Sequence, residues 1–92
     1  MHKYNVIAHR RVHKFLSTLR DENSKNAIKN DLAKLEDYPV ALRDMDVEKI
    51  KGAKDTFRLR VGKYRAIFHV DKTEKTIYVT HIEARKKVYE KI

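Results

Sequence analysis

Apolar and polar residues alternate along two short segments, 57–61 and 64–70, which are separated only by Gly62 and Lys63. A two-residue connection that begins with glycine is typical of a tight type II′ turn, and such a turn sets the register of the strands that it joins. The predicted cross-strand pairs are Val61–Tyr64, Arg60–Arg65, Leu59–Ala66, Arg58–Ile67 and Phe57–Phe68. The hairpin therefore has one apolar face, and its other face carries three arginines.

Two helices are predicted in the first half of the chain, after a short alternating strand at residues 4–8. The first helix runs from about His9 to Arg20, and Asn23 or Ser24 can cap the second. The second helix must end by Pro39, because a proline disfavours helical geometry in the residue before it. The residues expected on the inner faces of the two helices are Val12, Phe15, Leu16, Leu19, Ala27, Ile28, Leu32, Leu35 and Tyr38.

Residues 76–82 are rich in β-branched and aromatic side chains, which predicts a third consecutive antiparallel strand. With a four-residue loop before this strand, Val79 lies beside Phe68 on the core face, and Tyr78 and Thr80 lie beside the arginines. A slip of one residue exchanges the two faces, so this register remains open.

Residues 40–55 show no regular spacing of apolar residues, and we expect a loop with one short anchored turn there. The predicted fold is an α+β domain of the order β-α-α-β-β-β, followed by a short C-terminal helix or tail at residues 85–92. An antiparallel helical hairpin is expected to cover one face of a small, curved antiparallel sheet and to leave the other face open. A chain of 92 residues predicts a single domain, 1–92, with one modest core.

The composition narrows the classes of protein to consider. Without cysteine, the chain has neither disulfides nor thiolate-bound zinc. No apolar run approaches the roughly 20 residues that span a bilayer, and the start does not resemble a signal peptide, so we expect a cytoplasmic protein without a membrane partner. The second half holds 12 Lys or Arg against 5 Asp or Glu, which is +7 of the net charge of +9. This asymmetry favours a polyanion or an acidic protein as partner.

The arginine-bearing face of the hairpin is the strongest candidate for chemistry. Arginines directly opposite one another repel, and the hairpin contains no acidic residue before Asp71, so an anion from outside is expected to balance Arg58, Arg60 and Arg65. Guanidinium groups bind phosphate oxygens in a bidentate way, which points to a phosphate site. The alternative is a solvated basic sheet face. Lys51, Arg85 and Tyr89 are candidates to join such a groove, although the last two also fit an ordinary solvated helix end.

The sequence gives little support for a metal site or for the common kinds of hydrolase site. The chain has five histidines, but His9 and His13 are too few for a metal site and are interpreted as surface residues. His69 follows Arg65 and Ile67 on the same face, but a structural or rim role is favoured for it. With only two glycines, the chain has no nucleophile elbow and no phosphate-cradling loop, and no paired-carboxylate site is recognisable.

Three stretches of the chain resemble the RelE/ParE superfamily of toxins from toxin-antitoxin systems: KIKG at 49–52, FRLRVGKYRAIF at 57–68 and ARKKVY at 84–89. The similarity covers essentially the full length and implies a RelE-like fold. The RelE branch consists of ribosome-dependent messenger RNA endonucleases, whereas the ParE branch acts on DNA gyrase. The hairpin motif is specific for the superfamily but does not by itself separate these activities.

The resemblance implies a site for RNA cleavage. By position, its catalytic residues are Arg58, Arg60, Arg65, Arg85 and Tyr89. The expected RNA-binding residues are Lys51, Lys54, Lys63, His69 and Lys86. The resemblance implies no metal ion and no cofactor, and it implies two partners, a cognate RelB-like antitoxin and a ribosome that carries messenger RNA.

The expected chemistry is metal-independent transesterification, in which the ribose 2′-hydroxyl attacks the adjacent phosphate. In some members of the family the first-strand cations are lysines, whereas this chain has Arg58 and Arg60. Arginine does not lose its proton, so both can stabilise charge but neither is expected to act as a general base, and no carboxylate base is expected in the groove. One well-placed donor contributes roughly 3–4 kcal/mol. Tyr89 is expected to orient or exchange a proton, and the ribosome to position the codon.

Three hypotheses therefore follow from the sequence. The first is a RelE-type mRNA interferase, and the second is a ParE-like toxin that inhibits DNA gyrase without cutting RNA. The third is a non-toxic domain that binds nucleic acid.

Overall fold

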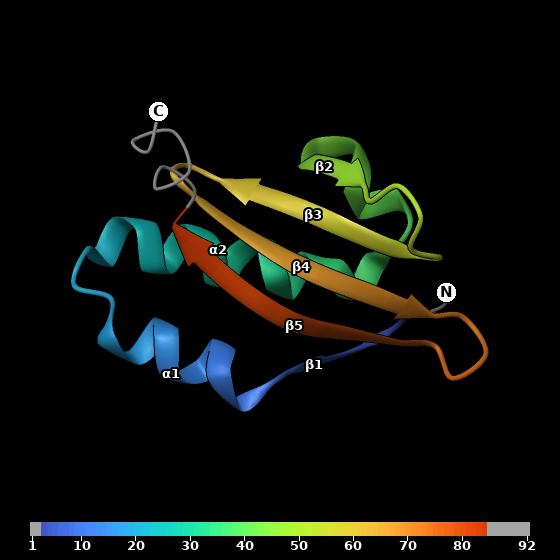
Figure 1. Ribbon diagram of the computed structural model, residues 1–92, viewed down its shortest axis with the longest axis horizontal. Helices are drawn as coiled ribbons and strands as arrows, with labels where there is room; N and C mark the ends of the chain where they lie inside the picture. Colours follow the sequence, from blue (N-terminus) through green and yellow to red (C-terminus); the bar gives the residue numbers. More distant parts are fainter. Residues whose placement is uncertain (1–2, 85–92) are drawn as a thin grey trace.

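Five strands form one sheet in the order β1-β5-β4-β3-β2 (Figure 1). The computed structural model describes residues 3–84. The strands are β1 (Asn5–Ala8), β2 (Asp46–Lys49), β3 (Thr56–Val61), β4 (Tyr64–Asp71) and β5 (Thr76–Ala84). The helices are α1 (Arg10–Thr18) and α2 (Glu22–Lys34), and two short 3₁₀ helices, η1 (Leu35–Asp37) and η2 (Val40–Asp44), follow them.

The sheet is mixed. Strand β1 runs parallel to β5, whereas β2–β3, β3–β4 and β4–β5 are antiparallel pairs. The α+β class is confirmed, and the expectation of a purely antiparallel sheet is wrong at this one edge. Tight turns force antiparallel pairing on β3, β4 and β5, but no turn joins the first strand to the last, so tertiary packing alone sets their relative direction.

The region 40–55 is the main error of the predicted fold. It contains η2 and the edge strand β2, where we expected a loop. Strand β2 is only four residues long. Val47 is its one apolar residue, and the other three, Asp46, Glu48 and Lys49, are charged. Such a segment shows almost no alternation in the sequence, and it becomes a strand because β3 supplies a hydrogen-bonding edge.

Both helices begin at a side-chain cap. The His9 Nδ1 accepts a hydrogen bond of 3.0 Å from the Arg11 amide at the start of α1. Asp21, not Asn23 or Ser24, caps α2, because its Oδ1 accepts from the backbone amides of both of those residues. No helix within residues 3–84 is long and apolar enough to cross a bilayer.

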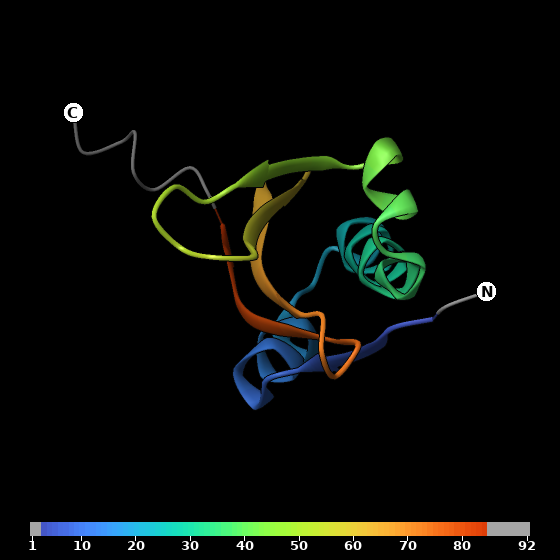
Figure 2. The ribbon, with the colours of Figure 1, turned by 90° about the vertical axis from the view of Figure 1, so that its right-hand side faces the viewer.

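The core lies between α2 and one face of the sheet, as Figure 2 shows in the view from the side. In that view the loop of residues 50–55 projects on the other side of the sheet, away from α2. The largest side chains that are fully buried are Phe68, Ile28, Leu35, Leu59, Ile77, Val12, Val70 and Val79. These residues come from both helices, η1 and the three central strands, as their spacing predicted. The expectation that Ala27 faces the core is wrong, because Ala27 is exposed.

The β3–β4 hairpin has the predicted register, with Arg60 opposite Arg65 and Leu59 opposite Ala66. Gly62 has a φ of +61°, and Lys63 is not among the residues with positive φ. A positive φ at the first central residue alone is the backbone of a type II′ turn, which confirms the turn read from the sequence.

Strand β5 has the predicted pairing at its start, where Val79 lies opposite Phe68. A β-bulge then interrupts the ladder: Ile67 lies opposite His81, so Thr80 has no partner on β4. Beyond the bulge, Ile82 lies opposite Ala66, which packs in the core. The extra residue thus keeps the apolar residues of β5 on the core face along the whole strand.

Candidate functional site

Three arginines lie together on the sheet face that points away from α2, which we call the arginine face. Arg58 and Arg60 come from β3, and Arg65 comes from β4. Their neighbours Leu59 and Ala66 are buried in the core, so strand alternation places all three guanidinium groups on the opposite side. The structure confirms the predicted common face.

Each of these arginines has a carboxylate partner within the protein. Arg58 Nη1 donates to Glu48 Oε1 at 2.9 Å, and Arg65 Nε donates to Glu83 Oε2 at 3.0 Å. The Arg60 Nε lies 3.4 Å from Asp46 Oδ2 but makes no hydrogen bond with it. The expectation that only an external anion balances the arginines is therefore wrong, and so is the expectation that no carboxylate lies in the groove.

The carboxylates escaped sequence analysis for two reasons. Asp46 and Glu48 belong to β2, which has no clear strand pattern, and they come to face Arg60 and Arg58 only through pairing with β3. Glu83 lies opposite Arg65 because of the bulge in β5. The presence of β2 and of the bulge is decided by packing, which single-sequence periodicity does not report.

The carboxylates of the three ion pairs are exposed, and the arginines are partly buried, with side chains 34%, 40% and 25% exposed for Arg58, Arg60 and Arg65. The side chains of Glu48, Asp46 and Glu83 are 59%, 62% and 61% exposed. Ion pairs as exposed as these contribute about 0–1 kcal/mol each, because water screens the charges and two flexible side chains lose freedom. A guanidinium has five N–H donors, and the contact with Glu83 is made through the Nε of Arg65. An incoming phosphate can therefore displace or share these partners at small cost.

Two of the expected RNA-binding residues lie near each other at one end of this face. His69 is exposed on the arginine face, and its Nδ1 lies 3.2 Å from Thr56 Oγ1. Lys54, in the loop between β2 and β3, lines the same surface hollow of about 420 Å³ as His69. Lys51 is exposed in the same loop, where it lines a neighbouring hollow of about 510 Å³.

Lys63 lies apart from this group, in the turn between β3 and β4 and close to Asp21. Hydrogen bonds from Ser24, above all from its hydroxyl, lower the pKa of the Asp21 carboxyl, and the charge of Lys63 lowers it further. Lys63 thus faces the start of α2. Three of the site residues expected from the sequence, Arg85, Lys86 and Tyr89, lie outside the described residues.

The structure also brings a residue of α1 to the edge of the arginine face. Arg11 Nη1 lies 2.7 Å from His81 Nε2 and 3.4 Å from the carbonyl oxygen of Thr80. An arginine can only donate, so the His81 Nε2 is the acceptor in this contact. Arg11 and His81 are 70 positions apart in the chain, and no local pattern predicts their contact.

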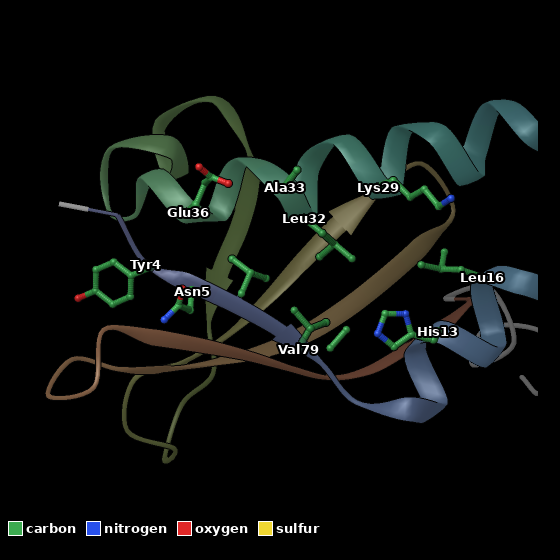
Figure 3. A pocket seen from close by; sticks show the side chains of 11 residues that line it. Tyr4, Asn5, His13, Leu16, Lys29, Leu32, Ala33, Glu36 and Val79 are labelled. Carbon is green, nitrogen blue, oxygen red and sulfur yellow. The ribbon is translucent and has the colours of Figure 1, made fainter. Parts of the chain in front are cut away.

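A pocket of about 430 Å³ lies on the other side of the sheet, between β1 and α2 (Figure 3). Leu16, Leu32 and Val79 line it together with polar side chains. Figure 3 shows that three of those polar side chains, His13, Lys29 and Glu36, come from the helical layer, whereas Asn5 comes from β1. None of the three arginines lines this pocket, so it is separate from the arginine face. Within residues 3–84, no group of three or more His, Asp or Glu side chains is placed to hold a metal ion.

Comparison with known proteins assigns the family. Residues 6–89 match the ParE toxin family of type II toxin-antitoxin systems, parDE. The chain belongs to the RelE/ParE superfamily of toxins. A relative of this toxin is RelE1 from Methanocaldococcus jannaschii, with 31% identity over 87 residues that make up 95% of this chain and 96% of the relative.

Solved RelE structures share the fold of this toxin. The RelE–RelB complex from Pyrococcus horikoshii OT3 contains a chain with a TM-score of 0.78 and 30% identity, covering 92% of this toxin and 98% of that chain. The isolated RelE toxin from E. coli has a TM-score of 0.72 at 18% identity, with coverage of 96% and 93%. At that level of identity the likeness concerns the fold alone.

Proposed function

We propose that this toxin is the RelE-type component of a RelBE-type toxin-antitoxin system and that it cleaves messenger RNA on the ribosome. The observation that carries the proposal is the common face of Arg58, Arg60 and Arg65, in a chain about 30% identical to two RelE proteins. Guanidinium groups held on neighbouring strands of a sheet are suited to grip the oxygens of one phosphodiester.

The proposed reaction needs no metal ion. The 2′-oxygen of a ribose attacks the adjacent phosphorus, the bond from phosphorus to the 5′-oxygen breaks, and the product carries a 2′,3′-cyclic phosphate. The three arginines bind the non-bridging oxygens, whose negative charge increases in the transition state. On the strength of the resemblance, Arg85 adds a further cation and Tyr89 orients or exchanges a proton.

The acidic partners of the arginines fit this chemistry. A phosphate that binds the guanidinium groups displaces exposed carboxylates, and the displaced groups remain on the same face. Glu48 and Glu83 then supply proton acceptors for the 2′-hydroxyl, a role that the permanently charged arginines do not fill. Lys51, Lys54 and His69 lie at one end of the arginine face, where they can bind the RNA backbone to one side of the reacting phosphate, and Lys86 is added by position in the sequence.

Two partners belong to the proposal. The solved structures from Pyrococcus horikoshii and Methanococcus jannaschii are complexes of RelE with RelB. We infer a RelB-like antitoxin for this chain as well. Its net charge of +9 favours an acidic antitoxin. The arginine face is an open surface that does not by itself hold a single strand in line for attack, so a ribosome that presents the codon supplies the positioning.

A second candidate function is inhibition of DNA gyrase by a ParE-like mechanism without RNA cleavage. Two observations favour it: the family that matches is named for ParE, and the three arginines are paired with carboxylates of the protein itself. In this case the arginines are structural or contact a protein surface.

Mapping of transcript ends after induced expression separates the two functions. RelE-type activity produces new 5′ ends inside codons of translated messages, and Arg65→Ala removes them. Arg20→Ala is the matched control, because it also removes one positive charge. Arg20 is exposed in the connection between α1 and α2. Growth arrest without new 5′ ends overturns the nuclease proposal and supports the ParE-like function.

A further inference from the structure

We propose that Tyr78 and His69 form a stacking platform for a nucleobase of single-stranded RNA, beside the phosphate-binding arginines. This inference rests on the proposed function and adds a base-binding subsite to it. The sequence placed Tyr78 beside the arginines in only one of two open registers, and it contains few aromatic residues that are exposed.

The two rings are neighbours across β4 and β5. Tyr78 lies directly opposite His69 in the strand register. Their neighbours along the strands, among them Phe68 and Val79, are fully buried, so both rings are on the arginine face. Side chains directly opposite each other in an antiparallel pair have Cβ atoms about 4.5–5.5 Å apart. The register thus places the two rings side by side on the arginine face.

Each ring also has a neighbour on its outer side, one on β1 and one on β3. Tyr78 is 37% exposed, and Ile7, its partner on β1, is 50% exposed. On the other side, the Nδ1 of His69 lies 3.2 Å from Thr56 Oγ1, which holds the imidazole in place. A row of four side chains, Ile7, Tyr78, His69 and Thr56, thus crosses four strands.

The platform is within reach of the arginines. Ile67 lies two residues before His69 on β4, and it pairs with Arg58. Two residues of a strand span about 6.6–6.8 Å. The row of Arg58 and Ile67 is thus next to the row of His69 and Tyr78, and a nucleotide whose base stacks on this platform can present a flanking phosphate to Arg58.

The chemistry of the surroundings favours a nucleotide over an apolar ligand. Exposed Lys54 lines the same hollow as His69, and Arg58 lies on the adjacent row. An exposed aromatic ring flanked by cations matches the alternation of bases and phosphates in a single strand. Stacking on a ring tolerates any base, as expected of a toxin that acts on many messages.

The test measures binding of a fluorescein-labelled, 2′-O-methylated RNA 8-mer to the full-length protein at 50 mM salt. Methylation blocks cleavage, so binding is measured independently of nuclease activity. Tyr78→Ala is expected to weaken binding about 5- to 150-fold, the usual range for loss of one stacked base. Tyr78→Phe keeps the ring and is expected to bind within twofold of the wild type. Val40→Ala is the control, because Val40 is an exposed apolar residue of η2.

Two further measurements make the result specific for stacking. An abasic 8-mer with the same phosphates should bind the wild type and Tyr78→Ala equally. The salt dependence of binding should be unchanged in Tyr78→Ala and shallower in Arg58→Ala, since only the arginine contacts phosphate.

Two outcomes overturn the inference. One is equal binding of the methylated RNA by the wild type and Tyr78→Ala, and the other is no detectable binding by the wild type. If equal RNA binding is accompanied by weakened binding of the antitoxin to Tyr78→Ala, this row is a protein-docking surface. Loss of stacking in Tyr78→Ala supports the inference even if programmed ribosomes show no cleavage, so the two proposals fail separately.

Discussion

Glu83 lies directly opposite Arg65, and its Oε2 accepts a hydrogen bond of 3.0 Å from the Arg65 Nε. Arg60, on the other side of Arg65, lies opposite Asp46. The four side chains form one row across the sheet, with two arginines in the middle and a carboxylate at each end. The repulsion between the arginines is thus relieved within the protein, in a way that leaves the guanidinium groups near the surface.

Neutralising Glu83 should strengthen binding of RNA by the arginine face. We expect Glu83→Gln to bind the methylated RNA about two- to fivefold more tightly at low salt, because the exposed ion pair that competes with phosphate is worth about 1 kcal/mol or less. For the same reason its free energy of unfolding in urea should fall by no more than about 1 kcal/mol. The control is Glu74→Gln, which removes an equal charge from the exposed loop between β4 and β5. Weaker binding in Glu83→Gln would contradict competition between the carboxylate and phosphate.

Arg65 should be needed for cleavage and not for folding. Arg65→Ala is expected to lower the rate of cleavage on programmed ribosomes about 10²- to 10³-fold, the usual effect of losing one donor to the transition state. Arg65→Lys keeps the charge without the fork of donors and should retain part of the rate. Arg20→Ala should cleave like the wild type. A wild-type rate in Arg65→Ala would remove Arg65 from the site.

The core beneath the arginine face should be sensitive to a single cavity. Leu59 lies between Arg58 and Arg60 in the sequence, and its side chain is fully buried on the opposite face of the sheet. Leu59→Ala should therefore lower the free energy of unfolding by about 2–5 kcal/mol. Urea denaturation measures this difference. Val40→Ala should change stability by less than about 0.5 kcal/mol, because Val40 is 60% exposed. A small effect at Leu59 would show that the sheet is not packed as described.

The cap of α2 should make stability depend on pH. Hydrogen bonds from Ser24 and Asn23 lower the pKa of Asp21 in the folded protein below its ordinary value of 3.8. The ionised Asp21 carboxylate therefore makes its full contribution to the free energy of unfolding above that value. This contribution is lost as the pH falls through the pKa of Asp21 in the folded protein. We expect Asp21→Ala to have a lower melting temperature than the wild type at pH 7, and the difference to shrink below pH 3.8.

Asp21→Asn is the matched variant for this prediction. Its amide oxygen still accepts hydrogen bonds from the start of the helix, but it carries no charge. The melting temperature of Asp21→Asn should lie between those of Asp21→Ala and the wild type at pH 7. A difference between Asp21→Ala and the wild type that stays constant down to pH 2 would rule out titration of Asp21 as its cause.

Much of this fold was predictable because the deciding information is local. The spacing of Val12 and Leu16 predicts one amphipathic helix, and that of Ile28 and Leu32 predicts another. Gly62 and Lys63 set the register of β3 and β4, since a two-residue turn allows only one pairing of the strands behind it. The alternation on either side of that turn then places all three arginines on one face without any knowledge of the rest of the molecule.

The surroundings of those arginines depended on residues that are distant in sequence or carry no pattern of their own. Strand β2 exists because β3 offers it an edge, and Glu83 reaches Arg65 because β5 gains one residue at Thr80 to keep Ile82 in the core. The sequence alone therefore determined which side chains share a face, through backbone periodicity and turn geometry. Only the tertiary structure decided which carboxylates lie beside them and which of two registers puts Tyr78 there, because those neighbours are chosen by packing across the sheet.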